Sequence, residues 1–315
     1  MIRLVGVFVV VLVLYAGMLA SDPFARTLSN HEILAGRLGF YGMLTLGVGI
    51  LIIAGGIDLS IGSVVGLGAV CFGMMLERGV SPWVAAAVTL VGSAGIGLVH
   101  GLLVTGLGLQ PFLVTLCGLF IYRGVAQWAT PNPVGLGERP EARFLRELLV
   151  GAPGEGGRNQ LLVLLAVTVV LTLFVHGTRY GRYLFAIGAN ENAARYAGVP
   201  TNRYKILAYV ICSAMAGIGA VLYLLNSSSV DPNSAGSWLE LYAITGAVLG
   251  GCSLRGGEGI VPGMVLGAAV LPLIRSLCGF NKVGNEIEFA VVGFALLLGT
   301  IADELLKRRA ARRPA

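Results

Sequence analysis

Long apolar runs separated by short polar connections fill most of the chain. A helix that crosses a bilayer needs about 20 predominantly apolar residues, because the hydrocarbon core is about 30 Å thick. The pattern therefore predicts an all-α fold with about ten transmembrane helices, several of them short, in a single domain over residues 1–315. The predicted spans are residues 3–20, 39–54, 60–76, 82–105, 111–129, 160–176, 205–225, 238–251, 260–278 and 287–302.

The composition agrees with a protein that lies in a lipid bilayer. Hydrophobic residues make up 56% of the chain, charged residues only 12%, and the mean hydropathy is +0.83. A soluble domain is about a quarter charged, so this chain lacks the polar residues to cover a soluble surface. The net charge of +6 could indicate nucleic acid. However, Lys and Arg cluster in short connections, which is typical of membrane topology, and we expect no nucleic-acid partner.

The distribution of charge predicts the orientation of the spans. Residues 177–204 and the tail 303–315 are rich in Lys and Arg, which favours the cytoplasmic side. The loop 130–159 balances acids against arginines and is expected to be periplasmic. Ten spans with both termini in the cytoplasm satisfy these three assignments.

Two similar glycine-rich segments interrupt the apolar pattern. Residues 55–63 read GGIDLSIGS and lie between two uncharged runs, and residues 250–270 repeat a Gly-Gly pair, a polar patch and a Gly-rich apolar helix. Paired glycines favour the end of a helix. Transporters often repeat a broken helix in their two halves, and the breaks mark the transport path. A break at membrane depth must be buried or line a cavity.

The lone acid of the first segment, Asp58, has two possible roles. It precedes a predicted helix, where its carboxylate would accept a backbone N–H of Ser60 or Ile61 as an N-cap. Alternatively, it lines a path for a polar solute. Both roles are compatible, because the cap would shape the break.

Small residues four apart occur in several predicted spans. Such spacing lets helix backbones approach closely within lipid and predicts tight helix packing rather than a particular function. The pairs are Gly62 and Gly66, Gly97 and Gly101, and Gly263 and Gly267.

A short helix is predicted within the basic connection, over residues 190–198. Asn190 is placed as its N-cap, Glu191 and Arg195 are spaced for an i,i+4 ion pair, and Gly198 is placed as C′. A helix of about eight residues is below the roughly 12–15 needed for stability in isolation. We therefore expect it to dock on a partner.

The sequence carries no motif for its own catalysis or cofactor. None of its three lysines follows a glycine, so the phosphate-binding pattern G-x-x-x-x-G-K-[ST] is absent, as are G-x-S-x-G and H-E-x-x-H. The five cysteines and three histidines are dispersed, so no metal site is predicted. We expect a protein that is not an enzyme, binds no cofactor, and takes energy from ATP only through another subunit.

Four stretches together resemble the permease subunit of ribose/galactoside-type carbohydrate ABC importers, in order over about residues 40–300. They are GGIDLSIGSVVGLGAV, QPFLVTLCGLFIYRGVA, GRYLFAIGANENAARYAGVPTNRYKILAYVICSAMAGIGAVL and ELYAITGAVLGGCSLRGGEGIVPGMVLGAA. The resemblance implies a multi-pass protein of the bacterial cytoplasmic (inner) membrane. It also implies import of a monosaccharide, with two permeases (a homo- or heterodimer), two ATPase subunits that bind ATP and Mg, and a periplasmic or lipid-anchored sugar-binding protein.

The resemblance also implies roles for particular residues. The helix at 188–198 corresponds to the coupling helix that rests on the ATPase, with Gly188, Asn190, Glu191, Ala194, Arg195 and Gly198. Residues 55–63 and 110–124 correspond to segments that face the central path. The candidate path residues are Asp58, Ser60, Ser63, Gln110, Thr115, Arg123, Asn226 and Glu240. One departure from the family is Tyr242, which stands where its members usually have Asp.

Two alternatives remain open at this stage. The cargo could be a nucleoside, a furanose-type signalling molecule or a branched-chain amino acid, whose carboxylate would favour a cation such as Arg123. A different class is an ion-coupled secondary carrier, which needs ionisable groups near the midplane. Asp58 and Glu240 are the acids placed for that role.

Overall fold

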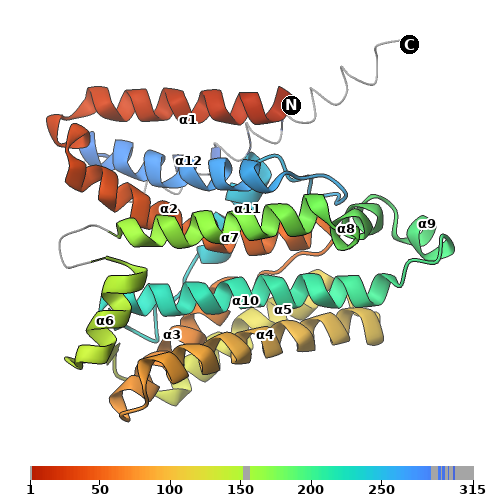
Figure 1. The fold of residues 1–315 in the computed structure, drawn as a ribbon, viewed down its shortest axis with the longest axis horizontal. Coiled ribbons are helices and arrows are strands. Elements are labelled where there is room, and N and C mark those ends of the chain that lie inside the picture. The colour runs from red at the N-terminus through yellow and green to blue at the C-terminus, as the bar shows by residue number, and fades with distance from the viewer. Residues whose placement is uncertain are drawn as a thin grey trace.

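The structure is a computed structural model that describes residues 2–151 and 157–284, together with residues 290, 291, 293, 294, 297 and 301. The described chain is a bundle of helices that run side by side along its long axis (Figure 1). The elements are α1 (Ile2–Ser21), η1 (Pro23–Arg26), α2 (Leu28–Ile53), α3 (Ile61–Glu77), α4 (Pro82–Gly106), α5 (Pro111–Ala129), β1 (Val134–Gly135), α6 (Pro140–Leu149), α7 (Arg158–Gly177), α8 (Arg179–Ala189), α9 (Glu191–Tyr196), α10 (Thr201–Ser227), β2 (Ser229–Val230), α11 (Leu239–Leu249) and α12 (Val261–Phe280).

The predicted all-α membrane fold is confirmed, whereas the number of ten spans is not. Within the described residues, seven helices are long and apolar enough to cross a membrane: α1, α2, α4, α5, α7, α10 and α12. The predicted spans at 60–76 and 238–251 correspond to shorter apolar helices, α3 and α11. The predicted span 287–302 lies largely outside the described residues.

Helix α2 begins at Leu28, well before the predicted start at residue 39. The side chain of Thr27 accepts a hydrogen bond from the backbone N–H of Asn30 at 3.3 Å and caps the helix. The first turns carry polar residues, including His31 and Glu32, so the apolar pattern alone placed the start too late. The helix therefore extends beyond its apolar segment.

Two amphipathic helices occupy connections that were predicted only as loops. Helix α6 lies within 130–159 and buries Ala142 and Leu145 against the bundle, whereas Phe144 and Leu148 are exposed. Helix α8 lies within 177–204 and is capped by Thr178, whose hydroxyl accepts from the N–H of Gly181 at 3.5 Å. Because each helix is short and only one face is apolar, neither produces a long hydrophobic run.

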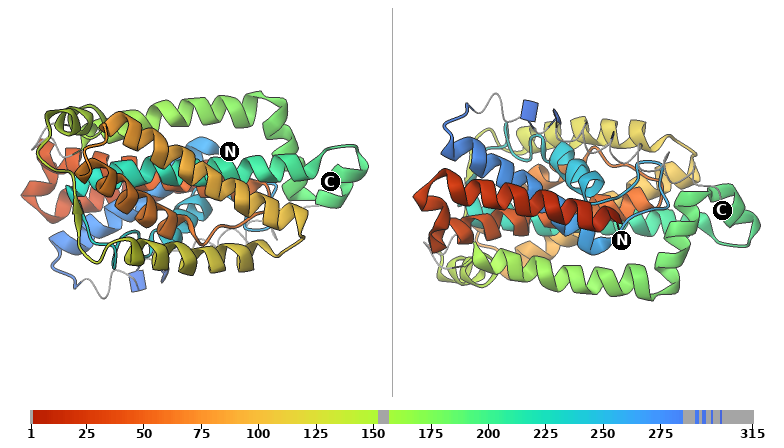
Figure 2. Two further views of the ribbon diagram at one scale, coloured as in Figure 1. Left: turned by 90° about the horizontal axis from the view of Figure 1, so that it is seen from below. Right: turned by 90° about the horizontal axis from the view of Figure 1, so that it is seen from above.

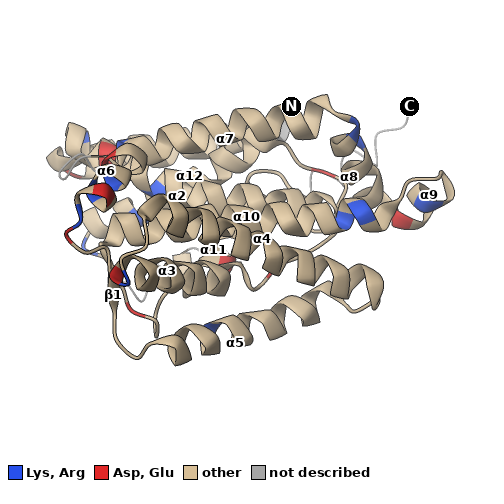
Figure 3. Cartoon of the chain, turned by 60° about the horizontal axis from the view of Figure 1, so that its bottom comes forward, with Lys and Arg blue, Asp and Glu red and all other residues tan. Residues whose placement is uncertain are grey.

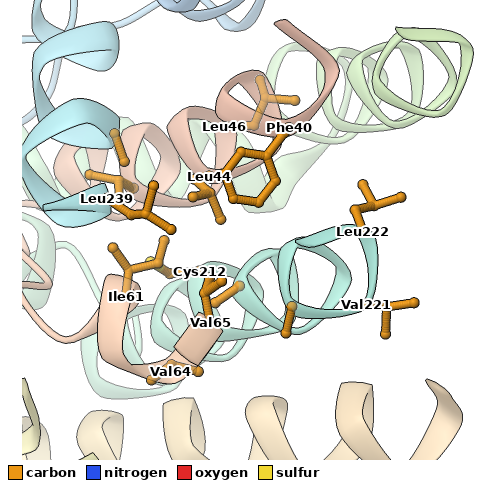
Figure 4. Close-up of a cluster of buried hydrophobic side chains, with 14 of the residues drawn as sticks. Phe40, Leu44, Leu46, Ile61, Val64, Val65, Cys212, Val221, Leu222 and Leu239 are labelled. Atoms are coloured by element: carbon orange, nitrogen blue, oxygen red, sulfur yellow. The ribbon is translucent and has the colours of Figure 1, made fainter. Parts of the chain in front are cut away.

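Helix α10 lies at the centre of the bundle and packs against α2, α3 and α4. Figure 4 shows aliphatic and aromatic side chains from α2, α3 and α10 meeting in one cluster, with Leu44, Val65 and Leu222 among them. Close packing of α4 on α10 depends on two glycines, as predicted. A methyl group on Gly97 would overlap the carbonyl oxygen of Tyr209, and one on Gly101 would lie 2.8 Å from the Cα of Ile206.

The two ends of the bundle carry most of the charged residues. Figure 3 shows Lys, Arg, Asp and Glu concentrated around α6 at one end and around α8 and α9 at the other, with few between. The N-terminal end of α1 points to the α9 end, and the views of Figure 2 agree. Which end is cytoplasmic, and the placement of residues 1–315 as one permease domain, stay predictions.

Candidate functional site

The first helix break follows α2 and has the geometry of a Schellman motif. The N–H of Gly55 donates to the carbonyl of Ile52 at 2.9 Å, and the N–H of Gly56 donates to that of Leu51 at 3.0 Å. Gly55 adopts a φ of +79°, a conformation that residues with a Cβ rarely adopt. Gly55 and Gly56 therefore end α2 as predicted.

The second break, after α11, repeats the same geometry. The N–H of Gly251, at φ +95°, donates to Val248 at 2.9 Å, and the N–H of Cys252 donates to Ala247 at 3.0 Å. The next helix, α12, then starts at Val261. The internal similarity seen in the sequence is thus confirmed as a repeated helix–break–helix unit, α2–α3 and α11–α12.

Asp58 is fully buried within the first break, at 0% exposure. Its Oδ1 accepts hydrogen bonds from the backbone N–H of Ser60 at 2.7 Å and from the Ser60 hydroxyl at 2.6 Å. Its Oδ2 accepts from the thiol of Cys212 on α10 at 3.8 Å. The N-cap position itself is Ser60, since α3 begins at Ile61. The predicted bond to Ser60 N–H is therefore confirmed, but Asp58 stands two residues before the cap rather than at it.

Three polar side chains from α4, α5 and α10, those of His100, Tyr122 and Tyr209, interact electrostatically with Asp58, and the sequence did not predict them. The hydroxyl of Tyr122 and Nε2 of His100 are hydrogen-bonded at 2.9 Å. The rings of His100 and Tyr209 pack edge to face with centroids 6.4 Å apart. Nδ1 of His100, Oη of Tyr209 and Oγ of Ser213 are buried and have no hydrogen-bond partner. The break is thus packed against a polar layer of the bundle.

A second pair of polar residues, Glu240 and Arg123, lies on helices that pack against α3. Glu240 on α11 is 6% exposed, its Oε2 has no hydrogen-bond partner, and it contacts the backbone at Gly62, where a methyl group would overlap the same oxygen. Arg123 on α5 is partly buried, and its Nε and Nη2 are buried without a partner. The charge of Arg123 acts favourably on the carboxylate of Glu240, although the two make no ion pair.

The remaining candidate path residues do not converge on one point. Ser63 and Thr115 are buried, and their hydroxyls donate to carbonyls of Ser60, at 2.8 Å, and of Pro111, at 3.0 Å. Gln110 and Asn226 are exposed. Gln110 is the N-cap residue of α5 and Asn226 lies in the last turn of α10, and these two helix ends lie at opposite ends of the bundle (Figure 1). The candidate set therefore spans the length of the bundle.

Tyr242 on α11 binds a cation that the sequence analysis missed. The guanidinium of Arg275 on α12 donates to the hydroxyl of Tyr242 at 2.9 Å and to that of Tyr41 on α2. Its Cζ also lies 4.8 Å from the ring centroid of Tyr242 and 5.6 Å from that of Tyr41. Tyr242 thereby links α11 to α12 through a cation–π contact and a hydrogen bond.

The short helix α9 spans Glu191–Tyr196, six residues rather than about eight. The side chain of Asn190 caps it by accepting from the N–H of Ala193 at 2.9 Å. The Glu191–Arg195 pair forms at 3.0 Å, and Lys205 at the start of α10 adds a second ion pair to Glu191 at 2.9 Å. Gly198, at φ +84°, ends the helix as C′.

Electrostatics reinforce this anchoring of α9 on α10. Partial burial raises the pKa of Glu191, but the hydrogen bond and charge of Lys205, together with the charge of Arg195, outweigh it and hold the pKa below its ordinary value. Lys205 is the better protected partner, since its side chain is only 15% exposed against 60% for Arg195. Ala194 is buried, and Tyr196 projects into solvent at 93% exposure.

The described part of the chain holds no group of three or more His, Cys, Asp or Glu side chains that could bind a metal ion. The five cysteines all lie in the described part and are free thiols. Of these, Cys71 and Cys117 are exposed and Cys212 and Cys252 are buried. The described residues therefore provide two helix breaks, buried polar groups and an anchored surface helix.

Comparison with known proteins identifies the class to which these features belong. The chain belongs to the family described as "Branched-chain amino acid transport system / permease component", whose profile matches residues 31–300. The ribose import permease protein RbsC of Escherichia coli (strain K12) is 30% identical over 296 residues, which cover 94% of this chain and 92% of that protein. RbsC of Bacillus subtilis (strain 168) is 28% identical over 301 residues, 95% of this chain and 90% of that protein.

A third relative is the fructose import permease protein FruF of Bifidobacterium longum (strain NCC 2705), 30% identical over 260 residues, 80% of this chain and 72% of that protein. No solved structure gave a significant match. The chain is accordingly a multi-pass permease of the bacterial inner membrane. Permeases of ABC importers act with an ATPase and a substrate-binding protein, and the family membership argues against an ion-coupled secondary carrier.

Proposed function

We propose that this chain is the transmembrane subunit of an ABC importer for a monosaccharide, either a pentose or a hexose, delivered by a substrate-binding protein. ATP and Mg would bind to a separate ATPase subunit, because the sequence has no phosphate-binding loop. The names of the relatives, which are ribose and fructose import permeases, support a monosaccharide.

The observation that carries the proposal is the separated pair of Arg123 and Glu240. Each presents buried polar atoms without a hydrogen-bond partner, and the pair lies beside the α3 helix that follows the first break. Unpaired buried groups are costly unless a ligand or water meets them. A guanidinium donates and a carboxylate accepts, so together they suit the hydroxyl groups of a neutral solute, which do both.

A branched-chain amino acid is the second candidate cargo, favoured by the unpartnered nitrogens of Arg123 and by the description of the family. The nearby carboxylate of Glu240 opposes it, since it would repel the carboxylate of an amino acid. An anionic cargo would bind Arg123 well only if no carboxylate lay nearby. We therefore propose a sugar as the cargo before an amino acid.

The position of α5 supports a second permease subunit. Among the described residues, this helix packs mainly on α3 and α4, and its outer face exposes Phe112, Leu113 and Phe120. It also carries the partly exposed Arg123 near its middle, and an arginine within a membrane-spanning helix almost always faces the bundle interior or a water-filled cavity. We infer that a second permease, identical or related, covers this face and that the path runs between the two copies.

The test is reconstitution with the cognate ATPase and binding protein in proteoliposomes, followed by uptake of radiolabelled ribose, fructose, other monosaccharides and leucine. We expect ATP-dependent uptake of one monosaccharide, and unlabelled leucine should not reduce this uptake. Arg123→Gln and Glu240→Gln should each lower that uptake while the complex still assembles. Uptake of leucine alone, or uptake without ATP, would contradict the proposal.

A further inference from the structure

The end of α8 wedges between the two helix breaks, and the three segments meet backbone to backbone. The N–H of Gly257, in the second break, donates to the carbonyl of Ile53, the last residue of α2, at 2.9 Å. Gly188 of α8 lies directly against this bond, because a methyl group there would overlap both the Ile53 oxygen and the Gly257 nitrogen. No side chain larger than hydrogen fits at this position without separating the two breaks.

Two further glycines complete the same contact. A methyl group on Gly256 would lie 2.8 Å from the carbonyl oxygen of Gly188 and 3.0 Å from the Cα of Gly55. A methyl group on Gly257 would lie 2.7 Å from the nitrogen and 2.9 Å from the Cβ of Ala189. Gly55, Gly256 and Gly257 also have positive φ values, so their backbones favour glycine independently of the packing. We call the contact of Gly55, Gly188, Gly256 and Gly257 the glycine joint.

The glycine joint is two residues from the surface helix α9. Gly188 is followed by Ala189 and by Asn190, which caps α9. The helix is then tied to the start of α10 by the Glu191–Lys205 pair. Only Ala189 and Asn190 therefore separate Gly188 from the first residue of α9.

We propose that the glycine joint fixes α8 rigidly to both helix breaks, so that a displacement of α9 moves the two halves of the transport path together. Packed backbone contacts of this kind transmit displacement because protein interiors are close-packed and compress little. One displacement of α9 thus moves both repeated units, α2–α3 and α11–α12, at the same time. Gly188, Gly256 and Gly257 are positioning residues in this inference, which rests on the proposed importer function.

The first test compares Gly188→Ala with Gly177→Ala in the reconstituted complex. Gly177, at the end of α7, has nothing within 4 Å of an added methyl group and serves as the matched control. For Gly188→Ala we expect the sugar imported per ATP hydrolysed to fall by about tenfold, within the range typical of coupling between two sites. Assembly with the ATPase should persist. Gly177→Ala should keep the wild-type ratio.

A second test does not require that the Gly188→Ala protein folds. Gly256→Ala and Gly79→Ala both place a Cβ at a positive φ. Only the methyl group at Gly256 would meet the joint, 2.8 Å from the carbonyl oxygen of Gly188, whereas the one at Gly79 meets nothing within 4 Å. We expect the sugar imported per ATP hydrolysed to fall in Gly256→Ala and to stay at the wild-type ratio in Gly79→Ala.

The outcomes separate this inference from the proposed function. An unchanged ratio in both Gly188→Ala and Gly256→Ala would overturn the rigid joint. A wild-type complex that imports no sugar would instead overturn the proposed function. Coupling by the joint could then still be measured as the stimulation of ATPase activity by whichever solute the complex imports.

Discussion

The thiol of Cys212 on α10 donates to Oδ2 of Asp58, with sulfur and oxygen 3.8 Å apart, while Oδ1 of the same carboxylate serves Ser60. The Asp58 carboxylate thus stabilises the turn of the first break through Ser60 and links the break to α10 through Cys212. We predict that Asp58→Ala destabilises the protein by about 1–3 kcal/mol, because the Ser60 N–H is left buried without a partner. Asp58→Asn keeps an oxygen for Ser60 and should retain much of the stability and transport.

Thermal unfolding and sugar uptake, both normalised to membrane abundance, test the two Asp58 variants. Cys212→Ser keeps a donor to Oδ2 and is the matched control. A well-folded Asp58→Asn protein that transports nothing would show that the charge, rather than the geometry of the break, is what transport needs.

The lowered pKa of Glu191 gives a pH dependence with a definite sign. A carboxylate whose pKa is lower in the folded state stabilises that state above its unfolded pKa, about 4.3, and the stabilisation is lost as the pH falls through the folded value. The difference in melting temperature between the wild type and Glu191→Gln should therefore be constant above about pH 5.5 and shrink at lower pH. A difference that grows on acidification would refute the ion-pair assignment.

Arg195→Glu places a second acid beside Glu191, and only Lys205 remains to balance both. We expect α9 to lose its fixed orientation, so that the complex assembles weakly or hydrolyses ATP without transport. Arg195→Lys, which keeps the charge, is the control. The measurement is co-purification with the ATPase together with the ratio of uptake to hydrolysis; normal values of both for Arg195→Glu would exclude α9 as the coupling helix.

The predicted orientation can be tested with single cysteines at Arg143 on α6 and Arg195 on α9, which lie at opposite ends of the bundle. The exposed native thiols Cys71 and Cys117 must be replaced first. A membrane-impermeant maleimide should label position 143 and not position 195 in cells with a permeabilised outer membrane. Labelling of position 195 and not of position 143 would show that the orientation is the reverse of the predicted one.

The sequence predicted the long helices because each carries an apolar run of bilayer length. It missed α6 and α8 because a short helix with one apolar face has no such run, and it placed the start of α2 late because polar residues such as His31 lie in the first turns. Both breaks were predictable, since a Gly-Gly pair ends a helix by a local motif. The sequence therefore predicted the long helices and the two breaks but not the short amphipathic helices.

In the candidate site, the contacts between neighbouring residues could be predicted from the sequence, and the contacts between distant helices could not. The bond from Ser60 to Asp58 spans two residues and follows from local geometry, whereas the bond from Cys212 to Asp58 joins positions 154 residues apart and depends on how α10 packs. The pairing of His100 with Tyr122 likewise requires α4 and α5 to be adjacent. Nothing in the spacing of these residues indicates such contacts.

Glycine packing between α4 and α10 gives a prediction for stability. Gly97→Ala would force the new methyl group into the carbonyl of Tyr209, and overpacking of this kind costs about 1–3 kcal/mol. Gly95→Ala, two residues earlier on the same helix, meets nothing within 4 Å and should leave the melting temperature unchanged or slightly raised. Equal melting temperatures for the two variants would contradict the close approach of the helices.

The pairing of Tyr242 with Arg275 tests whether a tyrosine can replace the acid usual at this position in the family that the sequence resembles. Tyr242→Phe keeps the ring beneath the guanidinium but loses the hydrogen bond, and we expect a loss of about 1.5–3 kcal/mol, as for other hydrogen bonds to charged groups. Tyr242→Asp supplies a carboxylate instead of the ring and should be better tolerated than Tyr242→Ala, which supplies neither. Melting temperature and uptake for the three variants are the measurement. If Tyr242→Asp proves as damaging as Tyr242→Ala while Tyr242→Phe is neutral, the ring alone holds Arg275, and the hydroxyl and its hydrogen bond are dispensable.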